Sequence, residues 1–138
     1  MEKNLETYMK MAVLWGENSY SQRNKVGCLI VKNNMIIADG YNGTPSGFPN
    51  DCEYRIEGKL VTKPEVLHAE SNAISKLACS TSNCTDATLF TTLAPCWDCA
   101  KLIIQSRIRC VYYRDEYKTN EGIVLLNRAG ISTIKIDV

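Results

Sequence analysis

The sequence has a single histidine, almost no net charge and no long apolar run. No stretch approaches the roughly 18 apolar residues needed to span a bilayer, and no basic N-terminal segment precedes an apolar one. We therefore expect a cytoplasmic protein with no membrane association. Sixteen basic residues stand against fifteen acidic ones, whereas proteins that bind nucleic acid polymers usually carry a clear basic excess. This balance favours a small-molecule ligand.

The odd number of cysteines, seven in all, argues against a disulfide framework in a chain without a secretory signal. Cys28 and Cys110 lie within the apolar runs VGCLIV and RCVYY, which predicts that both are small buried thiols. Cys96 and Cys99 have metal-binding spacing. The other cysteines share no such spacing and have no second histidine to complete a metal site; they are Cys52, Cys79 and Cys84.

The periodicity of apolar residues predicts an initial helix, a hairpin and then alternating helices and strands. At 138 residues the chain is long enough for one domain with its own core, residues 1–138. This order predicts an α/β fold with a five-stranded mixed sheet, helices on both faces and parallel later strands. Helices are expected at 4–15, 68–79, 96–106 and 121–129, and strands at 26–32, 35–41, 87–93, 109–113 and 132–137.

Turn and cap residues indicate where several of these elements end. Asn4 can cap the first helix, and Gly130 can stop the last one. Asn33 and Asn34 tolerate the positive φ of a hairpin turn. Residues 42–66 are rich in Gly, Pro and Asn and have almost no periodicity. A loop this long in a compact domain is usually functional, so we expect it to form the rim of a site.

Two short segments, HAE at 68–70 and PCWDC at 95–99, stand at predicted helix starts. Cys96 and Cys99 are three residues apart and therefore lie on one face of the first turn, where the helix dipole favours the metal-binding thiolate. With His68 they offer two sulfurs and one nitrogen. Zinc accepts this set in a tetrahedron, and three protein ligands leave a fourth position for water, as in catalytic sites. With one histidine available, we expect one zinc per chain.

Glu70 lies two residues beyond His68, so its carboxylate could reach zinc-bound water and move protons without binding the metal. Each part has an ordinary alternative when it is taken alone. A lone histidine is usually a core or surface residue, H-x-E occurs by chance, and CxxC can be a thioredoxin-like redox pair. The combination, with both segments at helix starts, favours catalytic zinc.

The motifs H-x-E and P-C-x-x-C together are the signature of zinc-dependent nucleobase deaminases. Beyond these motifs, the chain resembles the deoxycytidylate (dCMP) deaminase family over nearly its whole length, in the segments KVGCLIV, IIADGYNGTPSG, HAESNAI, TTLAPCWDCAKLIIQS and CVYYRDEY. The resemblance implies a three-layer α/β/α fold of the cytidine deaminase type. It also implies hydrolysis of dCMP to dUMP and ammonia, which supplies dUMP for dTMP synthesis.

The same resemblance implies roles for individual residues. Glu70 is expected to take a proton from water, deliver it to the adjacent ring nitrogen and help protonate the departing amino group. The backbone N–H of Ala69 is expected to hold the pyrimidine carbonyl, and Asn42 the sugar hydroxyl.

A nucleotide phosphate requires cations or hydrogen-bond donors at the edge of the site. For the basic candidates the alternative is an ordinary solvated loop charge. The first candidates, between the first helix and the first strand, are Ser21, Arg23 and Lys25, and the second are Tyr113 and Arg114.

Members of this family are typically homohexamers that dCTP activates and dTTP inhibits, with magnesium accompanying the triphosphate. The loop GYNGTPSG, residues 40–47, matches the region where such effectors bind, because glycine lets backbone amides approach phosphates closely. An ordinary turn would show the same glycine-rich pattern. The effector candidates are Gly43, Thr44, Ser46 and Gly47.

Three other functions fit parts of the pattern. A tRNA adenosine deaminase also uses HAE and PCxxC, but the near-neutral charge and the short chain argue against it. A polynucleotide cytosine deaminase would need aromatic and basic groups along a strand-binding groove, and Tyr112 and Tyr113 alone do not establish one. A non-catalytic zinc-binding interaction module makes a different prediction, since replacing Glu70 by Gln would leave its function intact.

Overall fold

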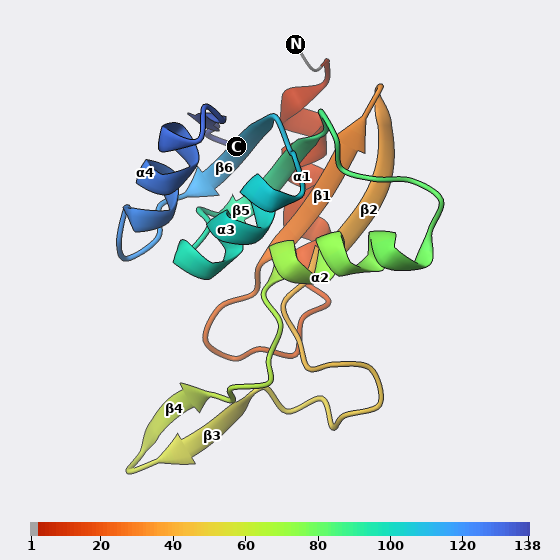
Figure 1. Cartoon of the computed structure of the whole chain (residues 1–138). Helices are drawn as coiled ribbons and strands as arrows, with labels where there is room; N and C mark the ends of the chain where they lie inside the picture. The colour runs from red at the N-terminus through yellow and green to blue at the C-terminus, as the bar shows by residue number, and fades with distance from the viewer. Residues whose placement is uncertain (1–2) are drawn as a thin grey trace.

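The centre of the molecule is a five-stranded sheet in the order β2-β1-β5-β6-β7 (Figure 1). The computed structural model describes residues 3–138. β1 runs antiparallel to both β2 and β5, whereas β5, β6 and β7 are parallel to one another. The strands are β1 (Gly27–Lys32), β2 (Met35–Tyr41), β5 (Thr88–Leu93), β6 (Cys110–Asp115) and β7 (Ser132–Lys135).

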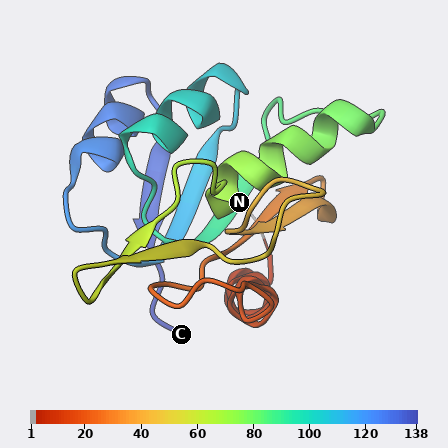
Figure 2. The same cartoon turned by 90° about the horizontal axis from the view of Figure 1, so that it is seen from below.

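Helices cover both faces of this sheet, as Figure 2 shows. On one face lies α1 (Leu5–Gly16), whose Met9 packs in a buried cluster with Leu29 and Phe90. On the other face lie α2 (Ala69–Lys76), α3 (Trp97–Gln105) and α4 (Glu121–Arg128). The expected three-layer α/β/α fold with a mixed five-stranded sheet is therefore confirmed. None of the helices within residues 3–138 combines the length and apolar character needed to cross a membrane.

Side chains of β1 point alternately to the two faces of the sheet, so this strand packs against the helices on both faces. Leu29 and Val31 belong to the cluster under α1, whereas Cys28 and Ile30 belong to the cluster under α2, α3 and α4. Successive side chains of a strand point to opposite faces, so a strand between two helical layers must be apolar at every position. The apolar run that predicted a strand is thus also the reason for its central place in the sheet.

The turn and cap predictions have different outcomes. Asn33 and Asn34 adopt φ values of 52° and 60° between β1 and β2, as a two-residue hairpin turn requires. Asn4 precedes α1 but forms no side-chain cap, so that prediction is wrong. Its backbone is left-handed, with φ 62°, whereas a capping side chain needs an extended backbone. The Asn4 carbonyl instead accepts a hydrogen bond from Tyr8 N at 3.0 Å.

The segment 42–66, expected to be a loop, contains a second hairpin, which we call the arm. It consists of β3 (Glu53–Ile56) and β4 (Lys59–Thr62), paired antiparallel, with Glu57 and Gly58 at positive φ in the turn. The arm projects away from the sheet and helices (Figure 1). Each strand has four residues and none of its side chains is buried. Strands so short and exposed lack the apolar alternation by which strands are predicted.

The cysteines assigned to the core differ in burial. Cys28 is fully buried and Cys110 is half-buried. Six cysteines have free thiols in the structure: Cys28, Cys52, Cys79, Cys84, Cys96 and Cys99.

Gly122, in the first turn of α4, allows that helix to touch the backbone beside the candidate metal ligands. A Cβ at this position would lie 2.0 Å from the carbonyl oxygen of Pro95. Replacing a helical glycine by alanine ordinarily stabilises a helix by about 1 kcal/mol, but overpacking against a backbone atom costs about 1–3 kcal/mol or more. We therefore expect Gly122→Ala to lower the free energy of unfolding, measured by urea denaturation. Gly43→Ala, which meets open space, is the control; an equal or higher stability for Gly122→Ala would contradict this packing.

Candidate active site

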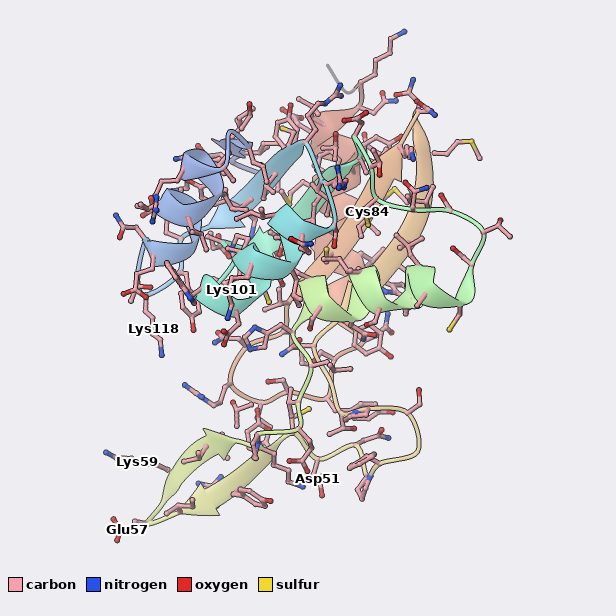
Figure 3. The ribbon with its side chains drawn as sticks, in the orientation of Figure 1. Asp51, Glu57, Lys59, Cys84, Lys101 and Lys118 are labelled. Carbon is pink, nitrogen blue, oxygen red and sulfur yellow. The ribbon has the colours of Figure 1, made fainter. Side chains whose placement is uncertain are left out.

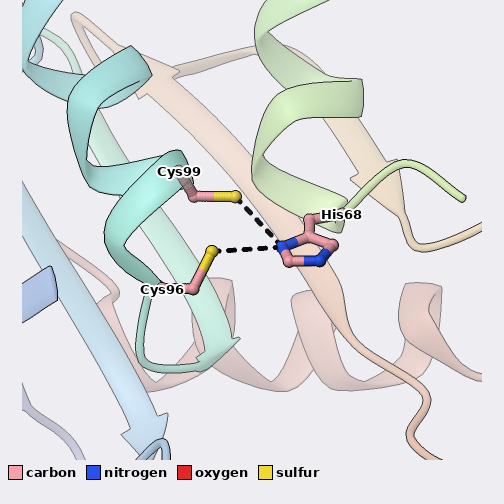
Figure 4. Close-up of side chains that lie close together, drawn as sticks. All are labelled: His68, Cys96 and Cys99. Carbon is pink, nitrogen blue, oxygen red and sulfur yellow. Dashed lines mark hydrogen bonds between the residues drawn. The ribbon is translucent and has the colours of Figure 1, made fainter. Parts of the chain in front are cut away.

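The candidate metal ligands come from the starts of two neighbouring helices. His68 immediately precedes α2 and Cys96 immediately precedes α3, both with extended backbones, and Cys99 lies in the first turn of α3. His68 Nδ1 lies 3.4 Å from Cys96 Sγ and 3.3 Å from Cys99 Sγ (Figure 4). The three ligand atoms lie within 4.8 Å of one another. The fold therefore brings together side chains that are 28 and 31 residues apart in sequence.

The spacing and chemistry of these atoms fit zinc. At usual bond lengths, a tetrahedral zinc holds a nitrogen and a sulfur ligand about 3.5 Å apart, close to the separations from His68 Nδ1. Two thiolates and one imidazole are ligands that zinc prefers, and three protein ligands are typical of catalytic sites. Within residues 3–138 this is the one group of His, Cys, Asp and Glu side chains found close enough together to hold a metal.

Hydrogen bonding within the cluster favours a thiolate. The Cys99 thiol donates to Cys96, which lowers the pKa of Cys96 to about 4. The same hydrogen bond raises the pKa of Cys99, because that thiol keeps the shared proton. The pKa of His68 is also raised, chiefly by its hydrogen bond with Cys96. A cluster that holds negative charge on sulfur is suited to a divalent cation, which thiolates rather than thiols bind.

Glu70 lies in the first turn of α2, two residues after His68, and only 4% of its surface is exposed. Burial is the main cause that raises the pKa of its carboxyl to about 7. A carboxyl with a pKa in this range can both accept and donate a proton at neutral pH, which is the property a general acid–base catalyst needs. Glu70 is thus a candidate proton-transfer group, buried beside the candidate metal ligands.

Two candidate metal ligands and Glu70 border a cavity of about 410 Å³. The polar residues at the edge of this cavity, which we call the rim, include Arg23, Thr62 and Lys118. The cavity lining includes His68, Glu70 and Cys96, together with the cations Arg23 and Lys118. A cavity of this size is within the range of sites for small organic molecules. A ligand here could therefore meet metal, proton-transfer group and cations at the same time.

The fold brings several of the sequence candidates to this cavity. Among the cavity-lining residues are Ser21, Arg23, Asn42 and Ala69, in addition to the metal ligands and Glu70. Asn42 also ties the strand ends together, since its Oδ1 accepts a hydrogen bond from Val26 N at 2.9 Å and its Nδ2 donates to Asn24 O at 2.8 Å. One amide hydrogen of Asn42 remains for a ligand.

Three phosphate candidates are not brought to the cavity lining: Lys25, Tyr113 and Arg114. Tyr113 and Arg114 lie inside β6, and Arg114 forms an ion pair of 2.8 Å with Asp115. In this part of the chain, the residues that line the cavity follow the end of β6; they are Glu116, Tyr117 and Lys118. Ligands of α/β sheets commonly bind beyond the carboxyl ends of strands, and this rule could have identified these residues in the sequence.

Thr62 also lines the cavity, and sequence reasoning missed it because the arm was not predicted. The effector candidates lie elsewhere in the same segment, and none of Gly43, Thr44, Ser46 and Gly47 is among the cavity-lining residues. Gly43 pairs with Leu67 through backbone hydrogen bonds, and Thr44 Oγ1 donates to Pro49 O at 2.9 Å. Gly47 has a positive φ of 88°.

Comparison with known proteins gives consistent matches. The family model described as "Cytidine and deoxycytidylate deaminase zinc-binding region" matches residues 2–115. The deoxycytidylate deaminase of Enterobacteria phage T4 is 32% identical over 170 residues, covering 94% of this chain and 88% of that protein. The human deoxycytidylate deaminase is 36% identical over 138 residues, an alignment that covers 92% of this chain and 76% of the human protein. A crystal structure of dCMP deaminase from the cyanophage S-TIM5, in complex with dCMP and dUMP, is 45% identical with a TM-score of 0.92 and covers 99% of each chain.

Proposed function

The chain belongs to the zinc-binding cytidine and deoxycytidylate deaminase family, and from this premise we propose that it hydrolyses dCMP to dUMP and ammonia. One observation carries the proposal: Glu70 and two of the zinc ligands share a cavity with Arg23 and Lys118. The similar cyanophage protein was crystallised with dCMP and dUMP. A substrate panel of dCMP, CMP, deoxycytidine and dCTP tests the proposal, and ammonia release should be fastest from dCMP.

His68, Cys96 and Cys99 would hold the zinc, because their ligand atoms lie within 4.8 Å of one another. When bound, zinc lowers the pKa of water toward 7 and so supplies a strong nucleophile at neutral pH. The side chain of Glu70 performs the proton transfers. It accepts a proton from the attacking water and gives it to the ring nitrogen next to the reacting carbon. It then passes the proton of the newly added hydroxyl to the amino group, which leaves as ammonia as the carbonyl forms.

The remaining cavity residues orient the nucleotide. Ala69, buried at the start of α2, has a backbone N–H that the helix does not use, and we propose that it binds the pyrimidine carbonyl. Asn42 contacts the sugar hydroxyl with its remaining amide hydrogen. The 5′-phosphate meets Arg23 and Lys118, which both line the cavity. Ser21 also lines the cavity, but its hydroxyl and N–H already donate to Glu53 Oε2 and Ser19 Oγ, so it has no donor left for the phosphate. The earlier candidates Lys25, Tyr113 and Arg114 are not needed for this arrangement.

Replacing Arg23 by Ala tests the phosphate contact. A lost charge-assisted hydrogen bond is expected to raise the KM for dCMP by roughly 10–100-fold. The KM for deoxycytidine, which has no phosphate, should change little. Lys25→Ala is the matched control, because it removes a neighbouring cation that does not line the cavity. Equal effects of Arg23→Ala on dCMP and deoxycytidine, measured by steady-state kinetics, would contradict the assignment.

We also propose that residues 1–138 form a single catalytic domain that assembles as a homohexamer in the cytoplasm.

By the family resemblance, dCTP activates and dTTP inhibits it, with magnesium accompanying the triphosphate. Within residues 43–47, Gly47 supports an effector site, because a glycine lets a phosphate approach the backbone closely. The Gly43 N–H already donates to Leu67 O. Addition of dTTP with magnesium is therefore expected to lower dCMP turnover. A flat response to dTTP in the same assay would remove the regulatory part of the proposal.

A further inference from the structure

The loop that carries Arg23 is attached to the base of the arm by a single carboxylate. Glu53 is the first residue of β3, and its Oε2 atom accepts three hydrogen bonds from the loop. The donors are Ser21 Oγ at 2.9 Å, Gln22 N at 3.0 Å and Arg23 N at 3.2 Å. Glu53 itself is not among the cavity-lining residues. It therefore acts on the cavity only through the residues that it holds.

A second arm residue holds the side chain of Arg23. Thr62 is the cross-strand partner of Glu53 at the base of the arm, and Thr62 Oγ1 accepts a hydrogen bond from Arg23 Nη1 at 3.0 Å. The two arm residues together fix the backbone and the guanidinium of Arg23. Thr62 and Arg23 both line the cavity, so this attachment lies where the phosphate is expected.

The charges are arranged so that Arg23 stays available to an anion. The Glu53 carboxylate binds two backbone N–H groups and a hydroxyl, and no carboxylate forms an ion pair with Arg23 among the residues that the structure describes. The acceptor on the guanidinium is the neutral Thr62 hydroxyl. Since an arginine paired with a carboxylate would have its charge and its donors occupied, this arrangement orients Arg23 without neutralising it.

The second carboxylate oxygen of Glu53, Oε1, receives no hydrogen bond from the described residues, so those to Oε2 from the loop are the ones that compensate for burial. Oε1 is buried and has no hydrogen-bond partner in the described range 3–138. All hydrogen bonds to the carboxylate from these residues therefore come from Ser21, Gln22 and Arg23. A partly buried carboxylate is stable only when hydrogen bonds replace its lost hydration, so the loop is strongly favoured in the position where its donors meet Oε2.

We propose that the base of the arm, Glu53 with Thr62, positions Arg23 for the 5′-phosphate and so selects nucleotide over nucleoside. This inference rests on the proposed function, since it concerns the substrate of that same site. Glu53 is a positioning residue, which acts through Arg23 and does not touch the substrate. The ordinary alternative is that Glu53 merely stabilises a surface loop.

The test is Glu53→Gln in the zinc-loaded enzyme, with Glu57→Gln as matched control. Both changes remove one negative charge from the arm, but Glu57 lies in the turn at its tip (Figure 3) and is not among the cavity-lining residues. A neutral amide oxygen accepts weaker hydrogen bonds than a carboxylate, so the KM for dCMP should rise by roughly 10-fold. The kcat for dCMP, the KM for deoxycytidine and both constants of Glu57→Gln should stay within about twofold of wild type.

The direction of the change in KM distinguishes two effects of Glu53→Gln: loss of the positioning of Arg23, and loss of a negative charge near the phosphate. Loss of a negative charge beside a phosphate site should by itself strengthen phosphate binding, which would lower the KM for dCMP. A rise therefore indicates positioning, and an unchanged or lower KM would overturn the inference. Thr62→Val, which removes only the hydroxyl, should raise the KM for dCMP by a few-fold. This variant also decides the question if thermal unfolding shows that Glu53→Gln is not folded.

A double-mutant cycle with Arg23→Ala completes the test. If Glu53 acts through Arg23, adding Glu53→Gln to Arg23→Ala should produce little further rise in the KM for dCMP. Independent effects that simply add would overturn the inference. A rise for Arg23→Ala with no rise for Glu53→Gln or Thr62→Val would remove the positioning role but leave the proposed function standing. Absence of ammonia release from dCMP in the wild type would instead refute the proposed function.

Discussion

Glu70→Gln is expected to lower the kcat for dCMP by roughly 10²–10⁴-fold while one zinc per chain is retained. The amide has the same shape as the carboxyl but cannot accept the proton of the attacking water or pass it on. Glu70 is buried in the cavity wall, so solvent cannot easily replace it in this role. Because Glu70 is not a metal ligand in this account, zinc content should not change. The measurement is steady-state ammonia release, combined with metal analysis of the same sample.

Glu116→Gln is the control for this variant. Glu116 also lines the cavity but is exposed, so its replacement should leave kcat near the wild-type value. Retained turnover in Glu70→Gln would contradict the proton-transfer role. Absence of turnover already in the zinc-loaded wild type would instead favour a non-catalytic zinc-binding module, for which this carboxyl has no function.

Cys99→Ser is expected to lose both zinc and activity. Cys99 is 2% exposed and lies 3.3 Å from His68 Nδ1, so the serine hydroxyl would replace a candidate ligand sulfur inside a small buried cluster. Removing residues that only hydrogen-bond a metal ligand typically costs roughly 10–100-fold in affinity or activity, and loss of a ligand itself should exceed this range. Competition with a chelator measures the zinc affinity, and ammonia release measures the activity.

Cys79→Ser is the matched control for the metal site. Cys79 is exposed and is not part of the candidate metal cluster, so its replacement should leave zinc content and turnover unchanged. Full zinc occupancy and turnover in Cys99→Ser would exclude the proposed ligand set. Two zincs per chain in the wild type would contradict the expectation of a single metal.

The order of the main elements could be predicted because the central strands and the helices each have a clear apolar pattern. β1 is apolar at nearly every position since it is covered on both faces by α1 and by α2, and such runs are recognisable in sequence. The arm could not be predicted in this way. Its side chains are exposed or half-buried, so no core selects apolar residues at alternate positions.

The candidate metal site could be predicted from the sequence, whereas the rim of the cavity could not. His68 and Glu70 are close in sequence, as are Cys96 and Cys99, so local spacing identifies both halves of the site. The rim depends on where β6 ends and on the contact between the arm and the loop at Arg23. The hydrogen bonds from the 21–23 loop to Glu53 span about 30 residues, and nothing in the local sequence indicates them.

The most direct test of the central claim is the conversion of dCMP by the zinc-loaded wild-type chain, with dUMP and ammonia measured together. We expect dUMP and ammonia to form in equal amounts from dCMP, and both to disappear when a chelator removes the zinc. Absence of dUMP and ammonia from dCMP, in a sample whose zinc content is one per chain, would contradict this expectation.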